Sequence, residues 1–184
     1  MNPFEMQCLH MSNSRFLVRI AFQGRLPSPD RFLPLEKKKF LCKNIVMSIE
    51  FWKNPRNTVS EIIHAWSPSK KYKTKSDCEY DLFCKIKYNL EDVAVKRQYG
   101  SGAHRVDIGV GNKVAIELKK DLRSSATVNK IMGEIRRLLK SDKWEFIIIV
   151  ICGYIIKEHL EELEHLVDNN SDYVEVIPKG KISS

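Results

Sequence analysis

The sequence of 184 residues predicts a domain of the α/β (α+β) class, with a mixed central sheet flanked by helices. Helical and strand patterns follow one another in the order α-β-β-β-α-β-α-β. The run Phe146–Cys152 is continuously apolar and rich in β-branched residues, which is typical of a central strand covered on both faces. With 43% hydrophobic and 29% charged residues, the chain can form a core of useful size.

Residues 1–47 are predicted to be a basic extension that is irregular or disordered. They show no sustained periodicity and contain four prolines. They hold eight Lys and Arg against three Asp and Glu, and so carry five of the eight net positive charges. Residues 48–184, expected to form a single domain, are only weakly basic, so their charge says little about a nucleic-acid partner. One hypothesis places the true start of the protein at Met47.

Two helices are predicted before the first strand. Thr58–Trp66 has apolar residues on one face and stops before Pro68, because the residue before a proline avoids helical backbone angles. Ser76–Leu90 is predicted to begin with a capping box, in which Ser76 pairs with Glu79 three residues later.

Three short strands are predicted next, over Val93–Arg97, Arg105–Val110 and Val114–Lys119. Gly111-Asn112 is a tight-turn signal, so the second and third strands should form a hairpin. A long amphipathic helix, the central strand, a last helix and a last strand then follow over Ser125–Leu139, Phe146–Cys152, Glu158–Val167 and Tyr173–Ile177.

The stretch RVDIGVGNKVAIELKK carries the candidate chemistry. Residues two apart on a strand share a face, so Glu117 and Lys119 lie together, and the hairpin brings Asp107 alongside them. Carboxylates are the usual protein ligands for Mg²⁺, which neutralises the charge that develops on a phosphate during cleavage. A lysine can orient the attacking water or help to deprotonate it. The alternative is an ordinary surface ion pair between Glu117 and Lys119.

This pattern resembles the PD-(D/E)xK nuclease superfamily, which includes restriction endonucleases, archaeal Holliday-junction resolvases and small viral nucleases. The resemblance covers residues 76–153, with Asp107 at the aspartate position and Glu117-Leu118-Lys119 at the ExK position. The chain departs from the family in two places. Val106 replaces the proline before the aspartate, and Gly133-Glu134 stands where many members carry a glutamine.

The resemblance implies a restriction-endonuclease-like core and a DNA endonuclease that uses Mg²⁺ or Mn²⁺, with Lys119 positioning or activating the water. The metal ligands it implies are Asp107, Glu117, the Leu118 carbonyl and, directly or through water, Glu79. The capping box with Ser76 is the competing explanation for Glu79. Members often act as dimers, so a homodimer is one form that the resemblance allows. Junction resolution, restriction and repair are not separated by this sequence.

Basic residues near the motif are candidate DNA contacts, although each could equally be solvated surface charge. They are Arg105 before the motif, Lys120 and Arg123 after it, and Lys70 and Lys71 in the linker between the first two helices. The rival function is a catalytically silent domain on the same fold, which binds nucleic acid or another protein.

Cysteine usage and hydropathy argue against other classes of protein. The five cysteines are scattered without a CxxC pair, which favours reduced thiols in a cytoplasmic protein over a disulfide frame or a zinc site. The longest apolar stretch, Phe146–Ile156, is interrupted by Gly153 and is shorter than the ~20 residues that span a bilayer. We therefore expect no membrane partner.

Overall fold

The structure is a computed structural model that describes residues 46–68 and 74–183. Its centre is a mixed sheet of five strands in the order β1-β2-β3-β4-β6. The strands are β1 Val95–Tyr99, β2 Val106–Val110, β3 Val114–Lys119, β4 Phe146–Ile151 and β6 Val174–Pro178. β2 pairs antiparallel with both β1 and β3, whereas β3, β4 and β6 run parallel to one another.

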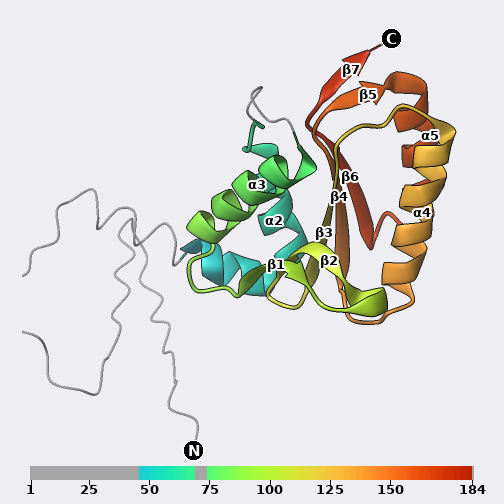
Figure 1. The fold of residues 1–184 in the computed structure, drawn as a ribbon. Coiled ribbons are helices and arrows are strands. Elements are labelled where there is room, and N and C mark those ends of the chain that lie inside the picture. Colours follow the sequence, from blue (N-terminus) through green and yellow to red (C-terminus); the bar gives the residue numbers. More distant parts are fainter. Residues whose placement is uncertain (1–45, 69–73, 184) are drawn as a thin grey trace, which may run out of the picture. The chain divides into compact units, whose positions relative to one another are not determined.

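Helices cover both faces of this sheet, with α2 and α3 on one side and α4 and α5 on the other (Figure 1). The helices are α2 Pro55–His64, α3 Lys75–Asn89, α4 Ser125–Leu139 and α5 Lys157–Asp168, and a short 3-10 turn, η1, spans Gly102–His104. The predicted class, a mixed sheet flanked by helices, is confirmed. The described helices include none that is both long and apolar enough to cross a membrane.

The start of α3 differs from the sequence prediction. Its capping box joins Thr74 and Asp77: the Thr74 hydroxyl accepts the Asp77 N–H at 3.2 Å, and the Asp77 carboxylate accepts the Thr74 N–H at 2.9 Å. The predicted box between Ser76 and Glu79 is therefore wrong. Glu79 is instead a buried residue with side-chain partners of its own.

Other bounds also differ. α2 begins at Pro55, because Asn54 accepts the Asn57 N–H as its N-cap and proline fits the first helical turn. Residues 46–53 are helical and bury Phe51, so the predicted irregular extension ends too late. The rest of that prediction concerns residues outside the described part of the chain. The parallel pair of β5 Tyr154–Ile156 and β7 Lys181–Ser183 was not expected.

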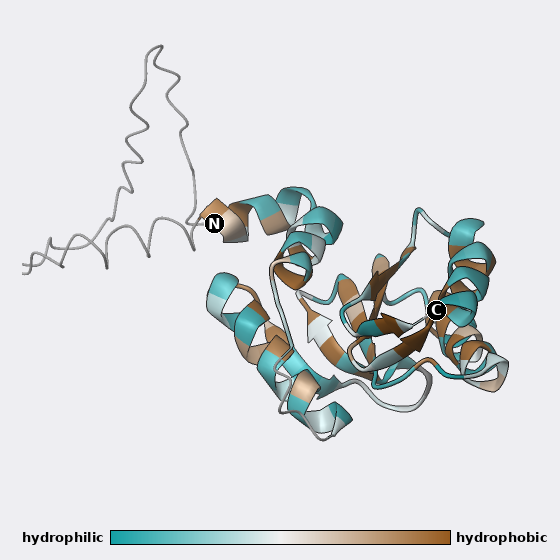
Figure 2. Cartoon of the chain, turned by 90° about the horizontal axis from the view of Figure 1, so that it is seen from above, coloured by the Kyte–Doolittle hydropathy of each residue, from teal (hydrophilic) through white to brown (hydrophobic). Residues whose placement is uncertain are grey.

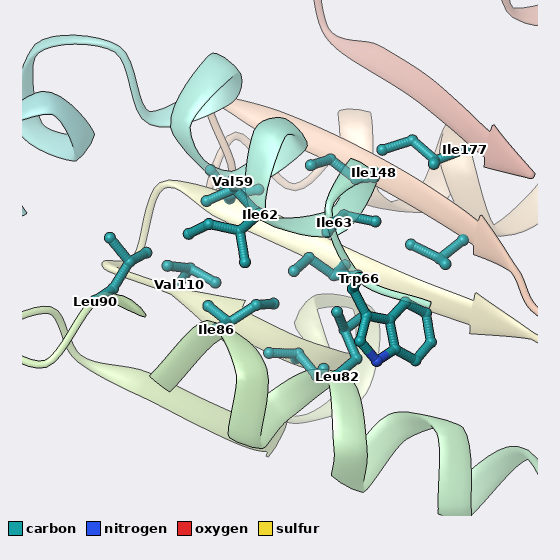
Figure 3. Close-up of a cluster of buried hydrophobic side chains, with 14 of the residues drawn as sticks. Val59, Ile62, Ile63, Trp66, Leu82, Ile86, Leu90, Val110, Ile148 and Ile177 are labelled. Atoms are coloured by element: carbon teal, nitrogen blue, oxygen red, sulfur yellow. The ribbon is translucent and has the colours of Figure 1, made fainter. Parts of the chain in front are cut away.

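The core forms one apolar layer on each side of the sheet. In β4 the alternate residues Phe146, Ile148 and Val150 belong to one layer, and Ile147, Ile149 and Ile151 to the other. Figure 3 shows the first layer, where side chains of α2 and α3 pack against the strands. The strands are mostly hydrophobic, while the helices carry both hydrophobic and hydrophilic residues (Figure 2). This confirms β4 as a central strand covered on both faces.

Candidate active site

Three of the four predicted catalytic residues, Asp107, Glu117 and Lys119, meet at one end of the sheet, where β3 ends and β2 begins. A pocket of about 430 Å³ opens there, and Asp107, Glu117, Leu118 and Lys119 all line it. In β3, Leu118 belongs to the apolar layer under α2 and α3, so Glu117 and Lys119 face the α4 side by alternation. The sequence-predicted convergence of two carboxyls and one ammonium is therefore present.

The tight turn of the β2–β3 hairpin sets this register. Gly111 and Asn112 both have positive φ, +58° and +57°, within the three-residue connection between Val110 and Val114, and the Lys113 N–H donates to the Val110 carbonyl at 3.0 Å. A Cβ at Gly111 would also lie 2.6 Å from the Phe51 ring. The ladder continues to Ile108 opposite Ile116, which leaves Asp107 and Glu117 as the next facing positions.

Burial and mutual repulsion dominate the electrostatics of the two carboxyls. Asp107 and Glu117 are 7% and 6% exposed, so both carboxyls are buried. Burial, and then the negative charge of Asp107, raise the pKa of Glu117 from 4.5 to about 8, against the lowering effect of Lys119. At neutral pH a proton is therefore held at this carboxyl pair, where a bound cation would supply positive charge instead.

Three basic side chains and one backbone N–H surround the two carboxyls. Lys75 Nζ lies 2.6 Å from Asp107 Oδ2, and the Leu118 N–H donates to the same oxygen at 2.8 Å. Arg137 Nη2 and Lys119 Nζ each lie 3.7 Å from a carboxylate oxygen of Glu117. Lys119 also forms a short ion pair with Glu134 of α4. The structure thus gives Glu134 a direct contact with the motif lysine.

The donor set suits a hard divalent cation. The Lys119 carbonyl accepts the Cys152 N–H at 3.0 Å, so it faces β4. Because successive residues of a strand direct their backbone groups to opposite edges, the Leu118 carbonyl faces the β2 edge, as its N–H does. Asp107, Glu117 and this carbonyl together offer three hard oxygens, which fits Mg²⁺ or Mn²⁺.

Glu79 is not brought into this ligand set. Its carboxylate accepts from Arg97 Nε at 2.9 Å and from Gln98 Nε2 at 2.8 Å. Within the described residues no group of three or more His, Cys, Asp or Glu side chains is placed to hold a metal ion. A contribution of Glu79 would therefore pass through an intervening group and not through direct ligation.

That intervening group is Gln98, which sequence reasoning did not single out. Its Nε2 donates to Glu79 and lies 3.4 Å from Asp107 Oδ1, while its Oε1 accepts from Arg105 Nη2 at 2.8 Å. Gln98 has φ +46°, a backbone conformation that non-glycine residues rarely adopt. Such an outlier persists only where its surroundings hold it, and here three side chains do so.

The candidate DNA contacts separate into three groups. Arg105 and Lys120 line the pocket. Arg123 does not line it; it pairs with Asp121 at 3.5 Å and lies over the Tyr154 ring. Lys70 and Lys71 lie outside the described residues. Pocket residues that the sequence did not single out are Lys75, Gln98, Lys130 and Arg137.

Glu117→Gln is expected to raise the melting temperature without metal, by an amount that grows with pH. The folded protein keeps the Glu117 proton up to its pKa of about 8, whereas the unfolded chain loses it near 4.5. Between these values the folded state binds the extra proton, so wild-type stability falls as pH rises and levels off above about 8. Glutamine cannot ionise and escapes this loss.

Melting curves in EDTA from about pH 4 to 9 would measure this difference. Glu164→Gln on the exposed side of α5 is the matched control, with no pH-dependent gain expected. A Glu117→Gln difference that stays constant with pH would contradict the assigned electrostatics.

No protein-family model, curated protein or solved structure matches this chain. The residues of the pocket are therefore the features of this chain that indicate a function.

Proposed function

We propose that this protein is a metal-dependent nuclease that hydrolyses phosphodiester bonds in DNA as an endonuclease, on a restriction-endonuclease-like core. One observation carries the proposal. Two buried carboxyls, Asp107 and Glu117, line one pocket with the Lys119 ammonium beside them. Burying two carboxyls side by side costs free energy, and such arrangements are typical of functional sites. A bound cation would offset the repulsion between the two carboxylates.

The pocket also suits an anionic substrate. It is lined by six basic and three acidic side chains, so phosphate would be attracted into it once a cation neutralises the carboxylates. Asp107, Glu117 and the Leu118 carbonyl would hold Mg²⁺ or Mn²⁺. When bound, the cation would neutralise charge that develops on the phosphate. Lys119 would hold the attacking water in line, and Gln98 would fix the orientation of Asp107.

Incubation with covalently closed plasmid tests this function. A closed circle has no ends, so its nicking in Mg²⁺ or Mn²⁺ and not in EDTA is the expected result for an endonuclease. Single-stranded DNA, RNA and a four-way junction under the same conditions would define the substrate. Cleavage that survives EDTA would contradict the proposed chemistry.

Thermal unfolding with added Mn²⁺ separates the nuclease from a catalytically silent domain. A working site binds the cation only when folded, so the melting temperature should rise with Mn²⁺ concentration. DNA binding without cleavage, together with no response to Mn²⁺, would favour the silent domain.

A further inference from the structure

A second hollow adjoins the candidate active site on the exposed side of α4. Its lining residues come from η1 and from the C-terminal half of α4: His104, Gly133, Arg136, Arg137, Lys140 and Ser141. Arg137 lines both this hollow and the catalytic pocket, so the two meet at its side chain.

A basic stripe on α4 connects the two hollows. Lys130, Glu134, Arg137 and Lys140 are spaced three or four residues apart, which places them along one side of the helix. Lys130 lines the catalytic pocket and Lys140 the second hollow. At ~1.5 Å per residue the stripe is roughly 15 Å long. That length corresponds to about four steps of one DNA strand at ~3.4 Å each.

Three cations of the stripe and the second hollow are not neutralised within the described part of the chain, whereas Arg137 pairs with Glu117. Lys130, Arg136 and Lys140 form no ion pair with any described residue, and Glu134, the one acidic residue of α4, is bound to Lys119. Basic residues in the last turn of a helix are favoured by its dipole, which could explain Arg136. The dipole does not explain Lys130, which lies in the first half of the helix.

Gly133 is a second, independent sign of a ligand at this surface. Glycine inside a helix is less stable than alanine there by roughly 0.5–1 kcal/mol. A Cβ at Gly133 would meet nothing within 4 Å, so packing does not require glycine. Its backbone has no positive φ either. Gly133 lines the second hollow together with Arg136 and Lys140, and its missing side chain leaves space there.

Arg137 holds this surface in register with the catalytic carboxyls. Its Nη1 donates to the Gly102 carbonyl and its Nη2 to the Arg105 carbonyl, both at 3.2 Å. The same Nη2 lies 3.7 Å from Glu117. An anion seated over α4 would therefore lie at a fixed position relative to Asp107 and Glu117.

We propose that the α4 stripe and the Gly133 hollow bind the phosphate backbone of duplex DNA beside the bond that is cut. This inference rests on the proposed nuclease function and adds the path of the substrate. Phosphates of the bound strand contact Lys130, Arg136 and Lys140, and one of them occupies the space over Gly133.

Binding of a short fluorescent DNA duplex in EDTA tests the stripe separately from cleavage. Arg136→Gln/Lys140→Gln should weaken affinity by about tenfold or more and flatten the salt dependence by about 0.9 per lost contact. Lys53→Gln/Lys157→Gln removes two exposed lysines from other elements and should change affinity by less than about twofold. Equal affinity and equal salt slope in the two double variants would overturn the proposal.

Gly133→Gln tests the hollow with a variant that should fold better than wild type. Glutamine favours the helix and fills the open space, so the melting temperature should rise while duplex affinity falls. Gly133→Ala should give a similar rise with a smaller loss of affinity, because it adds only a methyl group. Unchanged affinity in Gly133→Gln would reject the hollow as a phosphate site.

The two proposals fail in different ways. If the wild-type protein binds the duplex through α4 but never cuts DNA, the proposed nuclease function is rejected and the proposed DNA-binding surface is retained. Normal cutting together with normal binding by Arg136→Gln/Lys140→Gln would reject the surface alone. A wild-type protein that binds no DNA would reject both.

Discussion

Asp107→Asn is expected to reduce metal-dependent DNA cleavage by about 10³-fold or more. The substitution keeps the shape of the side chain. It also keeps an oxygen that can accept the Leu118 N–H, which donates to Asp107 Oδ2 at 2.8 Å in the wild-type protein. It removes one of the two charges that would hold the cation, and a catalytic metal supplies several kcal/mol of transition-state stabilisation, at ~1.36 kcal/mol per tenfold in rate. Single-turnover cleavage of plasmid in Mg²⁺ would measure the loss.

The stability of this variant distinguishes a catalytic carboxylate from a structural one. In EDTA the melting temperature of Asp107→Asn should equal or exceed that of wild type, because repulsion with Glu117 is relieved and Lys75 is exposed enough to be hydrated. Asp172→Asn, in an exposed turn, is the matched control and should retain full cleavage. A large loss of stability with little loss of cleavage would support a structural ion pair with Lys75.

The sequence predicted the elements whose own pattern is strong. Val114–Lys119 and Ser125–Leu139 have the predicted bounds, because strand alternation and an amphipathic stripe are both local properties. The convergence of Asp107 and Glu117 was also predictable, since the Gly111-Asn112 turn fixes the hairpin register.

What the sequence did not predict depends mostly on contacts between distant segments. Gln98 lies beside Asp107 because β1 pairs antiparallel with β2. No local sequence pattern predicts which strand β1 pairs with. The same holds for Lys75 and Arg137, which reach the pocket from two helices on opposite sides of the sheet. By contrast, the capping box of α3 could have been predicted from the sequence. Thr74 and Asp77 have the same three-residue spacing as Ser76 and Glu79, the pair that was predicted two residues later.

Lys119→Met should lower the single-turnover cleavage rate by about 10²–10⁴-fold at saturating protein and metal, which is the usual size of positioning and acid–base contributions. Methionine keeps much of the length of the side chain but lacks the ammonium that would hold the attacking water. Lys119→Arg should not restore the rate, because the planar guanidinium and its very high pKa suit neither the compact position nor proton transfer.

A matched ion pair at the start of the same strand provides the control. Lys113 precedes β3, lies outside the catalytic pocket and pairs with Glu145 at 2.5 Å. Lys113→Met should cost less than about 1 kcal/mol of stability and leave the cleavage rate unchanged, as expected of a pair with an exposed partner.

The ion pair between Lys119 and Glu134 allows the structural alternative to be tested directly. If Lys119 only neutralises Glu134, then Lys119→Met/Glu134→Gln removes both charges and should recover the wild-type rate. If its ammonium acts on the attacking water, the double variant should be as slow as Lys119→Met, because no group replaces the lost donor. Single-turnover rates in Mg²⁺ decide between the two. Full activity in the double variant or in Lys119→Arg would overturn the catalytic assignment of Lys119.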